Sequence, residues 1–573
     1  MNHEPTHGLS DAAVLAVIGC AVAICAGVWL WGGLAGAMFG RGWPSADAAE
    51  LLGVLIRLPS HLGDPAAAWP LPARLWLPGA AGFYGALVVL IVAAIGVVLL
   101  VRRAPPVGLL GRADGGARWA TARELRSLRG NVRFIGRRRS RGDRGGRLSL
   151  GHHRGRRLYA EQRHALVAFG PPQSGKSAGL AVPALLEWDG PAVASSIKTD
   201  LLDVTSARRR ALGTVFVFDP FELSGAASHT WSPLGGAGTW DGALEVAWRL
   251  AAAGELDQRG VDGGDFWAIA AEQRLAPLLF TAARTDGGIP ALVRWTYGQG
   301  ARELDEALAR LAGEAHDEPE LAEAHAAYDA VRAFESQADR TRSSIEATAQ
   351  ALLRAYRFSR VARSAQGCQI TADRLLDEAA TLYLIGDAKA SKLLRPIFLA
   401  LLGEVVDRAY ERATLAGGRL ELPLLLCLDE AGNVAPLPNL AEIASTAPSH
   451  NIQLVSIFHD LAQARSRYGR QAETMINSHR ARMLLPGVAD LDTLRYFAGL
   501  VGEEEIHEIT RTAGTGGTSR STGRRRRPLA AAEALRLLAE RHALLIYGRL
   551  APVQLRLRMW FEDRGLRRMA GPA

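Results

Sequence analysis

Lysine is scarce in this sequence of 573 residues. Its lysines are Lys176, Lys198, Lys389 and Lys392, so arginine supplies nearly all of the positive charge. A lysine ammonium and an arginine guanidinium are not interchangeable at a phosphate group, so a lysine inside a phosphate-binding pattern indicates chemistry at that position. The formal net charge of +9 and the pI near 9.7 favour an acidic partner, either nucleic acid or an anionic membrane surface.

Cysteine is just as scarce. Cys20 and Cys25 lie in an apolar run, and Cys368 and Cys427 are isolated. Four cysteines at these spacings exclude a disulfide framework and indicate a reducing compartment for the bulk of the chain.

Charged residues are absent from two long stretches near the N-terminus. Each stretch exceeds the roughly 20 residues that a helix needs to cross a bilayer. We therefore predict two transmembrane helices, over about 12–39 and 77–101, which together form a membrane anchor over residues 1–101. Residues 1–11 contain no lysine or arginine, and this argues against a signal peptide.

Arginine recurs constantly after the second stretch, beginning with Arg102 and Arg103. Positive charge next to a membrane span is typical of the cytoplasmic side. The large C-terminal part is therefore expected in the cytoplasm, as part of a multi-pass protein of the inner (cytoplasmic) membrane. The basic juxtamembrane segment, 102–160, fits two roles equally: contact with anionic lipid headgroups or contact with a DNA backbone.

A phosphate-binding pattern follows the short apolar run 166–169. The pattern G-x-x-x-x-G-K-[ST] is typical of a P-loop, in which backbone N–H groups and a helix N-terminus bind phosphates. Lys176 is expected to reach the β- and γ-phosphates of ATP, and the Ser177 hydroxyl to bind Mg²⁺. The candidate nucleotide-binding residues are Gly170, Pro171, Pro172, Gln173, Ser174, Gly175, Lys176 and Ser177.

A second apolar run, 424–428, ends in two carboxylates. A run that is apolar throughout is typical of a parallel strand buried on both faces. Asp429 is expected to hold Mg²⁺, and Glu430 to orient or activate the attacking water, as in a Walker B site. Lys176, Asp429 and Glu430 are therefore the candidate catalytic residues, and Ser177 and Asp429 the candidate metal ligands.

Short apolar runs alternate with helical patterns on both sides of a long helical region. This alternation predicts an α/β fold with a parallel sheet over 161–235 and 376–573. Residues 236–375 are rich in Ala, Leu, Glu and Arg at helical spacing, which predicts an inserted all-helical subdomain. The expected parallel strands are 166–169, 192–197, 215–218, 381–385, 424–428, 452–458 and 481–485.

Several other features have weaker interpretations. Lys198, Asp200 and Asp219 follow expected strands and are candidates for residues adjacent to the site. The run 511–528, rich in Gly, Ser, Thr and Arg, predicts a mobile basic loop. Expected strands over 544–547 and 553–560 close the sheet.

In this order, these motifs resemble the type IV secretion coupling proteins, the membrane-anchored ATPases of conjugation (TraG/TraD-like). The resemblance covers nearly the whole chain. Its motifs are Gly116-Ala117-Arg118-Trp119-Ala120-Thr121, the P-loop, Lys198, Trp231-Ser232-Pro233-Leu234, Leu428-Asp429-Glu430-Ala431-Gly432-Asn433, Asp460-Leu461-Ala462-Gln463 and Tyr468-Gly469.

The resemblance implies a RecA-like P-loop nucleotide-binding domain with the all-helical insertion, acting as a homohexamer. It implies ATP and Mg²⁺ as cofactors. It also implies that ATP hydrolysis drives the translocation of single-stranded DNA with an attached relaxase. Type IV secretion channel components and the cell membrane are the other implied partners.

The chain departs from this family at two places. Where many relatives have an arginine before the strand that follows Asp429 and Glu430, this chain has Pro448-Ser449-His450, and His459 replaces the usual Gln at that strand's end. These departures support one alternative, a receptor that binds nucleotide without hydrolysing it. A separate alternative is an FtsK-type translocase of double-stranded DNA, against which the long helical insertion and the two-span anchor argue. An ABC-type transporter ATPase is disfavoured, because no Leu-Ser-Gly-Gly-Gln stretch lies between the P-loop and Asp429.

Overall fold

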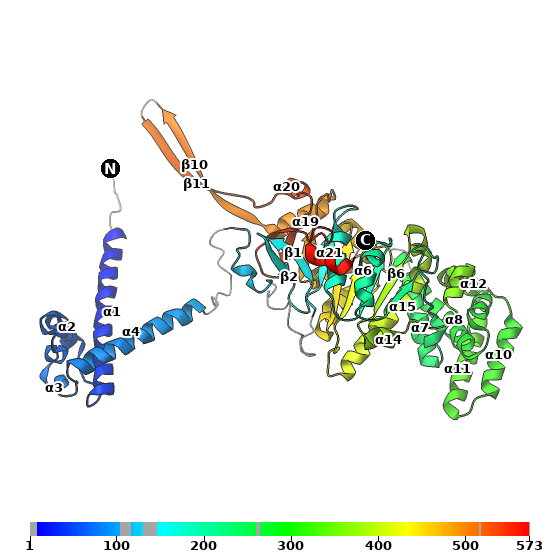
Figure 1. Ribbon diagram of the computed structural model, residues 1–573, viewed down its shortest axis with the longest axis horizontal. Coiled ribbons are helices and arrows are strands. Elements are labelled where there is room, and N and C mark those ends of the chain that lie inside the picture. Colours follow the sequence, from blue (N-terminus) through cyan, green and yellow to red (C-terminus); the bar gives the residue numbers. More distant parts are fainter. Residues whose placement is uncertain (1–7, 104–115, 130–145, 259–263, 515–516, 572–573) are drawn as a thin grey trace. The chain divides into compact units, whose positions relative to one another are not determined.

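The computed structural model describes residues 8–103, 116–129, 146–258, 264–514 and 517–571. The chain divides into two compact units, Met1–Ala113 and Asp114–Ala573 (Figure 1). The candidate catalytic residues all belong to the second unit.

The first unit is helical. Most of each charge-free stretch lies in a long helix, α1 for the first and α4 for the second. The indole of Trp31 on α1 donates a hydrogen bond of 2.7 Å to the carbonyl oxygen of Phe83 on α4. Trp69 and Phe83 are buried in the small core of this unit. Its helices are α1 (Gly8–Phe39), α2 (Ala48–Arg57), η1 (Leu58–His61), η2 (Pro65–Ala68), α3 (Leu71–Arg74) and α4 (Ala80–Arg103).

Within the described residues, no helix combines the length and the apolar character that a membrane span requires. The transmembrane helices predicted over 12–39 and 77–101 are therefore not confirmed. Parts of the basic segment, 104–115 and 130–145, lie outside the described residues.

Among its described residues, the second unit is built on one mixed sheet of eleven strands. The seven strands from β9 to β5 run parallel, and β12, β13, β1 and β2 extend the sheet through antiparallel pairs. In spatial order the strands are β2 (Arg156–Tyr159), β1 (Ser149–His153), β13 (Val553–Arg556), β12 (His542–Tyr547), β9 (Ala481–Leu484), β3 (Leu166–Phe169), β8 (Ile452–Phe458), β7 (Leu424–Leu428), β4 (Ala192–Ser196), β6 (Thr381–Ile385) and β5 (Val215–Phe218). The seven predicted parallel strands are confirmed.

Both faces of the sheet are buried, which explains why strands β3 and β7 are apolar throughout. On β3, Val167 and Phe169 face one hydrophobic cluster, while Leu166 and Ala168 face another. Successive side chains of a strand point to opposite faces, so a strand covered on both sides needs no polar alternation.

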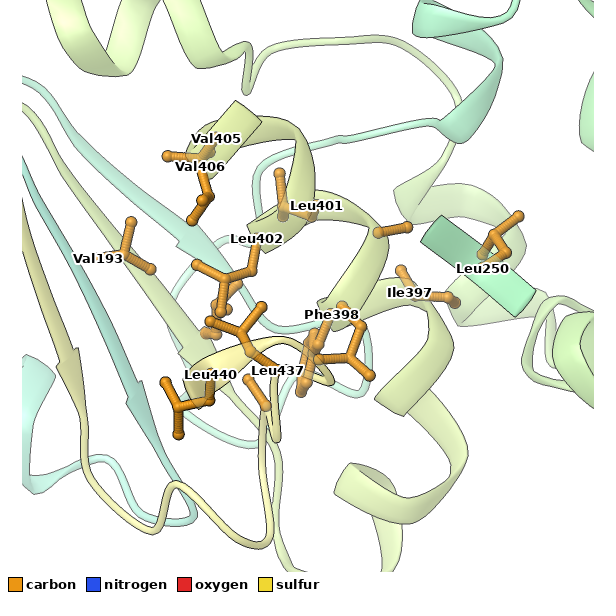
Figure 2. Close-up of a cluster of buried hydrophobic side chains, with 14 of the residues drawn as sticks. Val193, Leu250, Ile397, Phe398, Leu401, Leu402, Val405, Val406, Leu437 and Leu440 are labelled. Atoms are coloured by element: carbon orange, nitrogen blue, oxygen red, sulfur yellow. The ribbon is translucent and has the colours of Figure 1, made fainter. Parts of the chain in front are cut away.

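Helix α15 (Ala388–Leu415) covers one of these faces. Figure 2 shows its residues Phe398 and Leu402 among the buried side chains, together with Val193 of strand β4 and Leu250 of helix α7 (Trp240–Gln258). The same hydrophobic cluster therefore joins the sheet to the helices that follow β5.

Among the described residues between β5 and β6, the regular secondary structure is helical and contains no strand. Helices α8 and α10–α12 gather at one end of the second unit (Figure 1). This region contains η6 (Pro233–Gly236), α7 (Trp240–Gln258), α8 (Gly264–Arg284), α9 (Gly288–Thr296), α10 (Ala301–Gly313), α11 (Glu318–Glu335), α12 (Asp339–Leu353), η7 (Arg354–Arg357), α13 (Ser359–Ser364) and α14 (Ala372–Asp377).

The second unit contains further helices outside this region. They are η3 (Glu124–Arg126), the π-helical turn η5 (Ser177–Ala181), α5 (Val182–Glu187), α6 (Asp200–Arg210), α16 (Leu440–Thr446), η8 (Ala447–His450), α17 (Leu461–Tyr468), α18 (Gln471–Ser478), α19 (Leu491–Val501), α20 (Ala532–Arg536) and α21 (Arg564–Ala570).

Two parts of the sequence fold differently from their predicted form. The end of the basic segment supplies strands β1 and β2, which the arginine-rich composition had hidden. The predicted basic loop 511–528 is wrong: most of it is strand β11 (Gly517–Pro528), which pairs with β10 (Glu503–Gly514) in a two-stranded hairpin. Cross-strand charge pairs favour this hairpin, since Arg527 donates to Glu504 at 2.6 Å.

A buried arginine on α6 ties the loops at one end of the sheet together. The Arg209 guanidinium donates to the carbonyl oxygens of Trp188, Gly190 and Ala379 and to the hydroxyl of Thr381, at 2.6 Å for Gly190 and Thr381. Burial lowers the pKa of Arg209 to about 10, so the side chain is still charged at neutral pH. The four acceptors compensate for the burial of this charge.

We predict that Arg209→Ala lowers the free energy of unfolding by about 3 kcal/mol, because it leaves buried acceptors unsatisfied and a cavity behind. Urea denaturation of the purified full chain measures this. The exposed Arg210 on the same helix is the matched control, and Arg210→Ala should change the value by less than about 1 kcal/mol. Equal effects of the two substitutions would contradict this account of Arg209.

Candidate functional site

The P-loop lies between strand β3 and the first helical turn after it. Gly170 follows β3 directly, and the π-helical turn Ser177–Ala181 begins at the end of the loop. Gln173 and Gly175 both have left-handed backbone, with φ of 67° and 88°. Gly175 also lies close to other side chains, since a Cβ there would be 3.3 Å from the Met559 methyl carbon. A side chain at this position would be strained and crowded.

The sheet order brings the two predicted motifs together. Strand β8 lies between β3 and β7 and is parallel to both. The carboxyl ends of parallel strands meet at one edge of a sheet, where α/β proteins bind their ligands. The P-loop after β3, Asp429 after β7 and His459 after β8 therefore converge at this edge.

Direct hydrogen bonds join the two motifs. The Ser177 hydroxyl donates to Oδ2 of Asp429 at 2.5 Å, and the Lys176 ammonium donates to Oε1 of Glu430. All three charged groups are nearly inaccessible, with 7% of Lys176, 2% of Asp429 and 4% of Glu430 exposed. The predicted candidate residues Lys176, Ser177, Asp429 and Glu430 therefore form one cluster.

Glu430 is held by several donors. Nδ2 of Asn433 donates to its Oε2 at 2.8 Å, and Nε2 of His459 donates to the same oxygen at 2.7 Å. Burial alone would raise the pKa of Glu430, but the bonds from His459 and Lys176 outweigh it and lower the pKa to about 2. The backbone of Glu430 is left-handed, with φ of 63°, which is uncommon for a residue with a side chain and occurs at functional sites.

Asp429 has a different environment. Burial raises its pKa to about 6, although the hydrogen bond from Ser177 acts in the opposite direction. Its Oδ1 atom is buried and has no hydrogen-bond partner among the described residues. An unpaired buried carboxylate oxygen is costly, and a bound cation would remove that cost.

The donor set fits a hard divalent cation such as Mg²⁺. Ser177 and Asp429 offer oxygen atoms, and Mg²⁺ commonly takes only one or two protein ligands, completed by water and phosphate oxygens. In the described part of the chain, no group of three or more His, Cys, Asp and Glu side chains could hold a metal by itself. Ser177 and Asp429 therefore suit a cation whose remaining ligands are water and phosphate oxygens.

The other candidates adjacent to the site have different positions. Lys198 and Asp200 are exposed and follow β4, the neighbour of β7. Asp219 is buried and follows the edge strand β5, where its carboxylate accepts hydrogen bonds of 2.7 Å from the N–H and the hydroxyl of Ser224. Asp219 therefore stabilises its own turn rather than the cluster.

Sequence reasoning did not assign two of the contacts described above. His459 was recognised only as a departure at a strand end, yet it binds Glu430 directly. No local pattern in the sequence indicated that Met559 contacts the P-loop, because the two segments are far apart in the chain. The strand expected over 553–560 ends at Arg556, so Met559 lies beyond it.

The loop between β3 and the next helical turn ends in Lys176 and Ser177, which bond to the buried carboxylates of Asp429 and Glu430. This arrangement defines a P-loop protein. The chain matches, over residues 118–572, the family described as Type IV secretory system Conjugative DNA transfer, and it belongs to that family. The predicted resemblance is therefore confirmed.

Two curated relatives illustrate the range of sequence similarity. The chain is 25% identical over 359 residues to the conjugal transfer protein TraG of Escherichia coli, covering 60% of this chain and 55% of TraG. It is 23% identical over 434 residues to the protein VirD4 of Rhizobium rhizogenes, covering 71% of this chain and 60% of VirD4. The chain thus spans little more than half the length of these relatives.

Solved structures support the fold. The bacterial conjugative coupling protein TrwBdeltaN70, in an unbound form, has a TM-score of 0.54 at 16% identity, covering 78% of this chain and 93% of that chain. The plasmid coupling protein TrwB in complex with ADP and Mg²⁺ has a TM-score of 0.52 at 16% identity, with the same coverage. At such identities the similarity concerns the fold alone, and it confirms the predicted α/β fold of the RecA-like type.

Proposed function

We propose that this chain is a membrane-anchored ATPase that couples DNA and an attached relaxase to a type IV secretion channel. ATP hydrolysis would drive the translocation of single-stranded DNA. The observation that carries this proposal is the convergence of Lys176, Ser177, Asp429 and Glu430 in one buried cluster. Membership of the conjugative DNA transfer family supports the DNA substrate.

Each residue of the cluster has a role in this proposal. The loop from Gly170 to Ser177 would hold the phosphates through its N–H groups, and Ser177 and Asp429 would hold Mg²⁺. The bound cation would neutralise the charge that develops on the phosphates. Lys176 is paired with Glu430 in the structure, so it must leave that carboxylate to reach a phosphate. Glu430 would then be free to orient the attacking water.

The domain division is also part of the proposal. We propose that residues 161–235 and 376–573 form the ATPase domain, with 236–375 as its helical insertion and 102–160 as the basic juxtamembrane segment. Residues 1–101 would anchor the chain in the inner membrane as a pair of spans. The support for an anchor is the pair of charge-free stretches followed by Arg102 and Arg103. The homohexamer and the channel partners rest on the family resemblance.

The contact between His459 and Glu430 bears on the receptor alternative. The replacement of the usual Gln by His459 was one reason to consider a protein that binds nucleotide without hydrolysing it. Nε2 of His459 donates to Glu430 at 2.7 Å, and a glutamine amide could also donate at this position. His459 therefore keeps a donor beside the carboxylate, which favours the ATPase.

The proposal predicts that the purified full chain in detergent hydrolyses ATP faster when single-stranded DNA is present. Lys176→Ala should weaken ATP binding, while Glu430→Gln should keep binding and lower turnover by about 100-fold. Phosphate release and equilibrium binding measure the two quantities. Lys392→Ala, at an exposed lysine of α15, is the matched control and should behave like the unchanged chain.

Two results would redirect the proposal. Binding of ATP without turnover at concentrations that allow assembly would contradict the ATPase and support the receptor. Stimulation by double-stranded but not single-stranded DNA would contradict the substrate and support an FtsK-type translocase.

A second prediction concerns His459 as a residue that positions Glu430. His459→Ala should lower kcat for ATP by about 10- to 100-fold with little change in KM, because its contact is with Glu430 and not with the loop. His459→Gln restores a donor and should recover most of kcat. His450→Ala, at a half-buried histidine whose Nδ1 bonds to the carbonyl oxygen of Thr446, is the control. Equal loss in the Ala and Gln variants would contradict this role.

A further inference from the structure

The chain after strand β13 turns toward the P-loop. The backbone N–H of Trp560 donates to the carbonyl oxygen of Ala178 at 3.1 Å. A Cβ at Gly179 would lie 3.1 Å from Cβ of Leu557 and 3.2 Å from the sulfur of Met559. Residues 557–560 therefore pack directly on the first helical turn after the P-loop.

Two aromatic side chains lie on this segment. Trp560 is half-buried and packs against the hydrophobic cluster that contains Met559. The neighbouring ring of Phe561 is 42% exposed and meets the Trp560 ring edge to face, with centroids 5.9 Å apart. The Trp560 ring thus supports the Phe561 ring, and the exposed ring of Phe561 is accessible to a ligand.

The turn that carries these rings is fixed by hydrogen bonds. The N–H groups of Glu562 and Asp563 both donate to the carbonyl oxygen of Met559 at 3.0 Å. The Glu562 carboxylate pairs with the guanidinium groups of Arg541 and Arg556. An exposed ring on a fixed turn loses little conformational entropy when it binds a ligand.

The order of groups along the P-loop indicates which part of a nucleotide would approach this turn. Lys176 and Glu430 mark the end where the β- and γ-phosphates bind. The first helical turn, which includes Ala178, lies at the end where backbone N–H groups bind the α-phosphate. The ribose and the base extend from the α-phosphate, so they would leave the loop beside residues 557–561.

We propose that Phe561, supported by Trp560, is the platform on which the purine base of the bound nucleotide stacks. Bases stack favourably on aromatic side chains, and such stacking does not require hydrogen bonds to the base. This inference rests on the proposed nucleotide-binding function and adds to it a subsite for the base.

The test compares two ligands that share their phosphates but differ in the base. Isothermal calorimetry on the full chain would measure Kd for ATP and for inorganic tripolyphosphate, each with Mg²⁺. Phe561→Ala should raise Kd for ATP about 10-fold and leave Kd for tripolyphosphate unchanged. Phe358→Ala, at a ring that is 51% exposed and contacts Phe221, is the matched control and should change neither value.

Two further variants keep the test informative if Phe561→Ala fails to fold. Phe561→Tyr keeps an aromatic face and should keep the affinity for ATP, whereas Phe561→Leu should lose it. An unchanged Kd for ATP in both the Ala and Leu variants would overturn the platform while leaving the proposed function intact. If the unchanged chain binds neither ATP nor tripolyphosphate, the proposed function itself fails.

Discussion

The buried pairing of Lys176 with Glu430, beside that of Ser177 with Asp429, is the interaction on which the site depends. Two adjacent carboxylates away from water are costly unless donors or cations compensate them. Glu430 has three donors, from Lys176, Asn433 and His459, whereas Asp429 has one bond from Ser177 and one unpaired oxygen. The charge of Glu430 is therefore compensated by donors, whereas Asp429 keeps one oxygen atom available to a cation.

The sheet makes this pairing possible. The two motifs are separated by more than 240 residues in sequence, including the helices between β5 and β6. Because β8 lies between β3 and β7, the loops after these three strands reach one another at the same edge. Hydrophobic side chains pack on both faces of the sheet and hold its strands in place. The positions of the charged residues at the sheet edge are therefore set by this packed core rather than by the loops.

Much of the fold and part of the site could be predicted from the sequence. The P-loop and the apolar strand before Asp429 have strong local patterns, and parallel strands buried on both faces appear as continuous apolar runs. The hairpin of β10 and β11 was missed because it forms by pairing the run with residues 503–514, and composition alone does not show which segment pairs with it. Strand β2 carries the exposed Arg156, and the place of β1 in the sheet depends on the distant strand β13. The roles of His459 and Met559 depend on contacts between segments far apart in sequence, for which a single sequence carries no signal.

A double-mutant cycle between Lys176 and Glu430 tests the central claim most directly. The free energy of unfolding of the nucleotide-free full chain would be measured for Lys176→Met, Glu430→Gln and the double variant. Each single substitution leaves a buried partner without its counter-charge, so the account predicts a coupling energy of about 2 kcal/mol. A coupling energy near zero would contradict it, because the two side chains would then contribute independently and the buried pair would not organise the site.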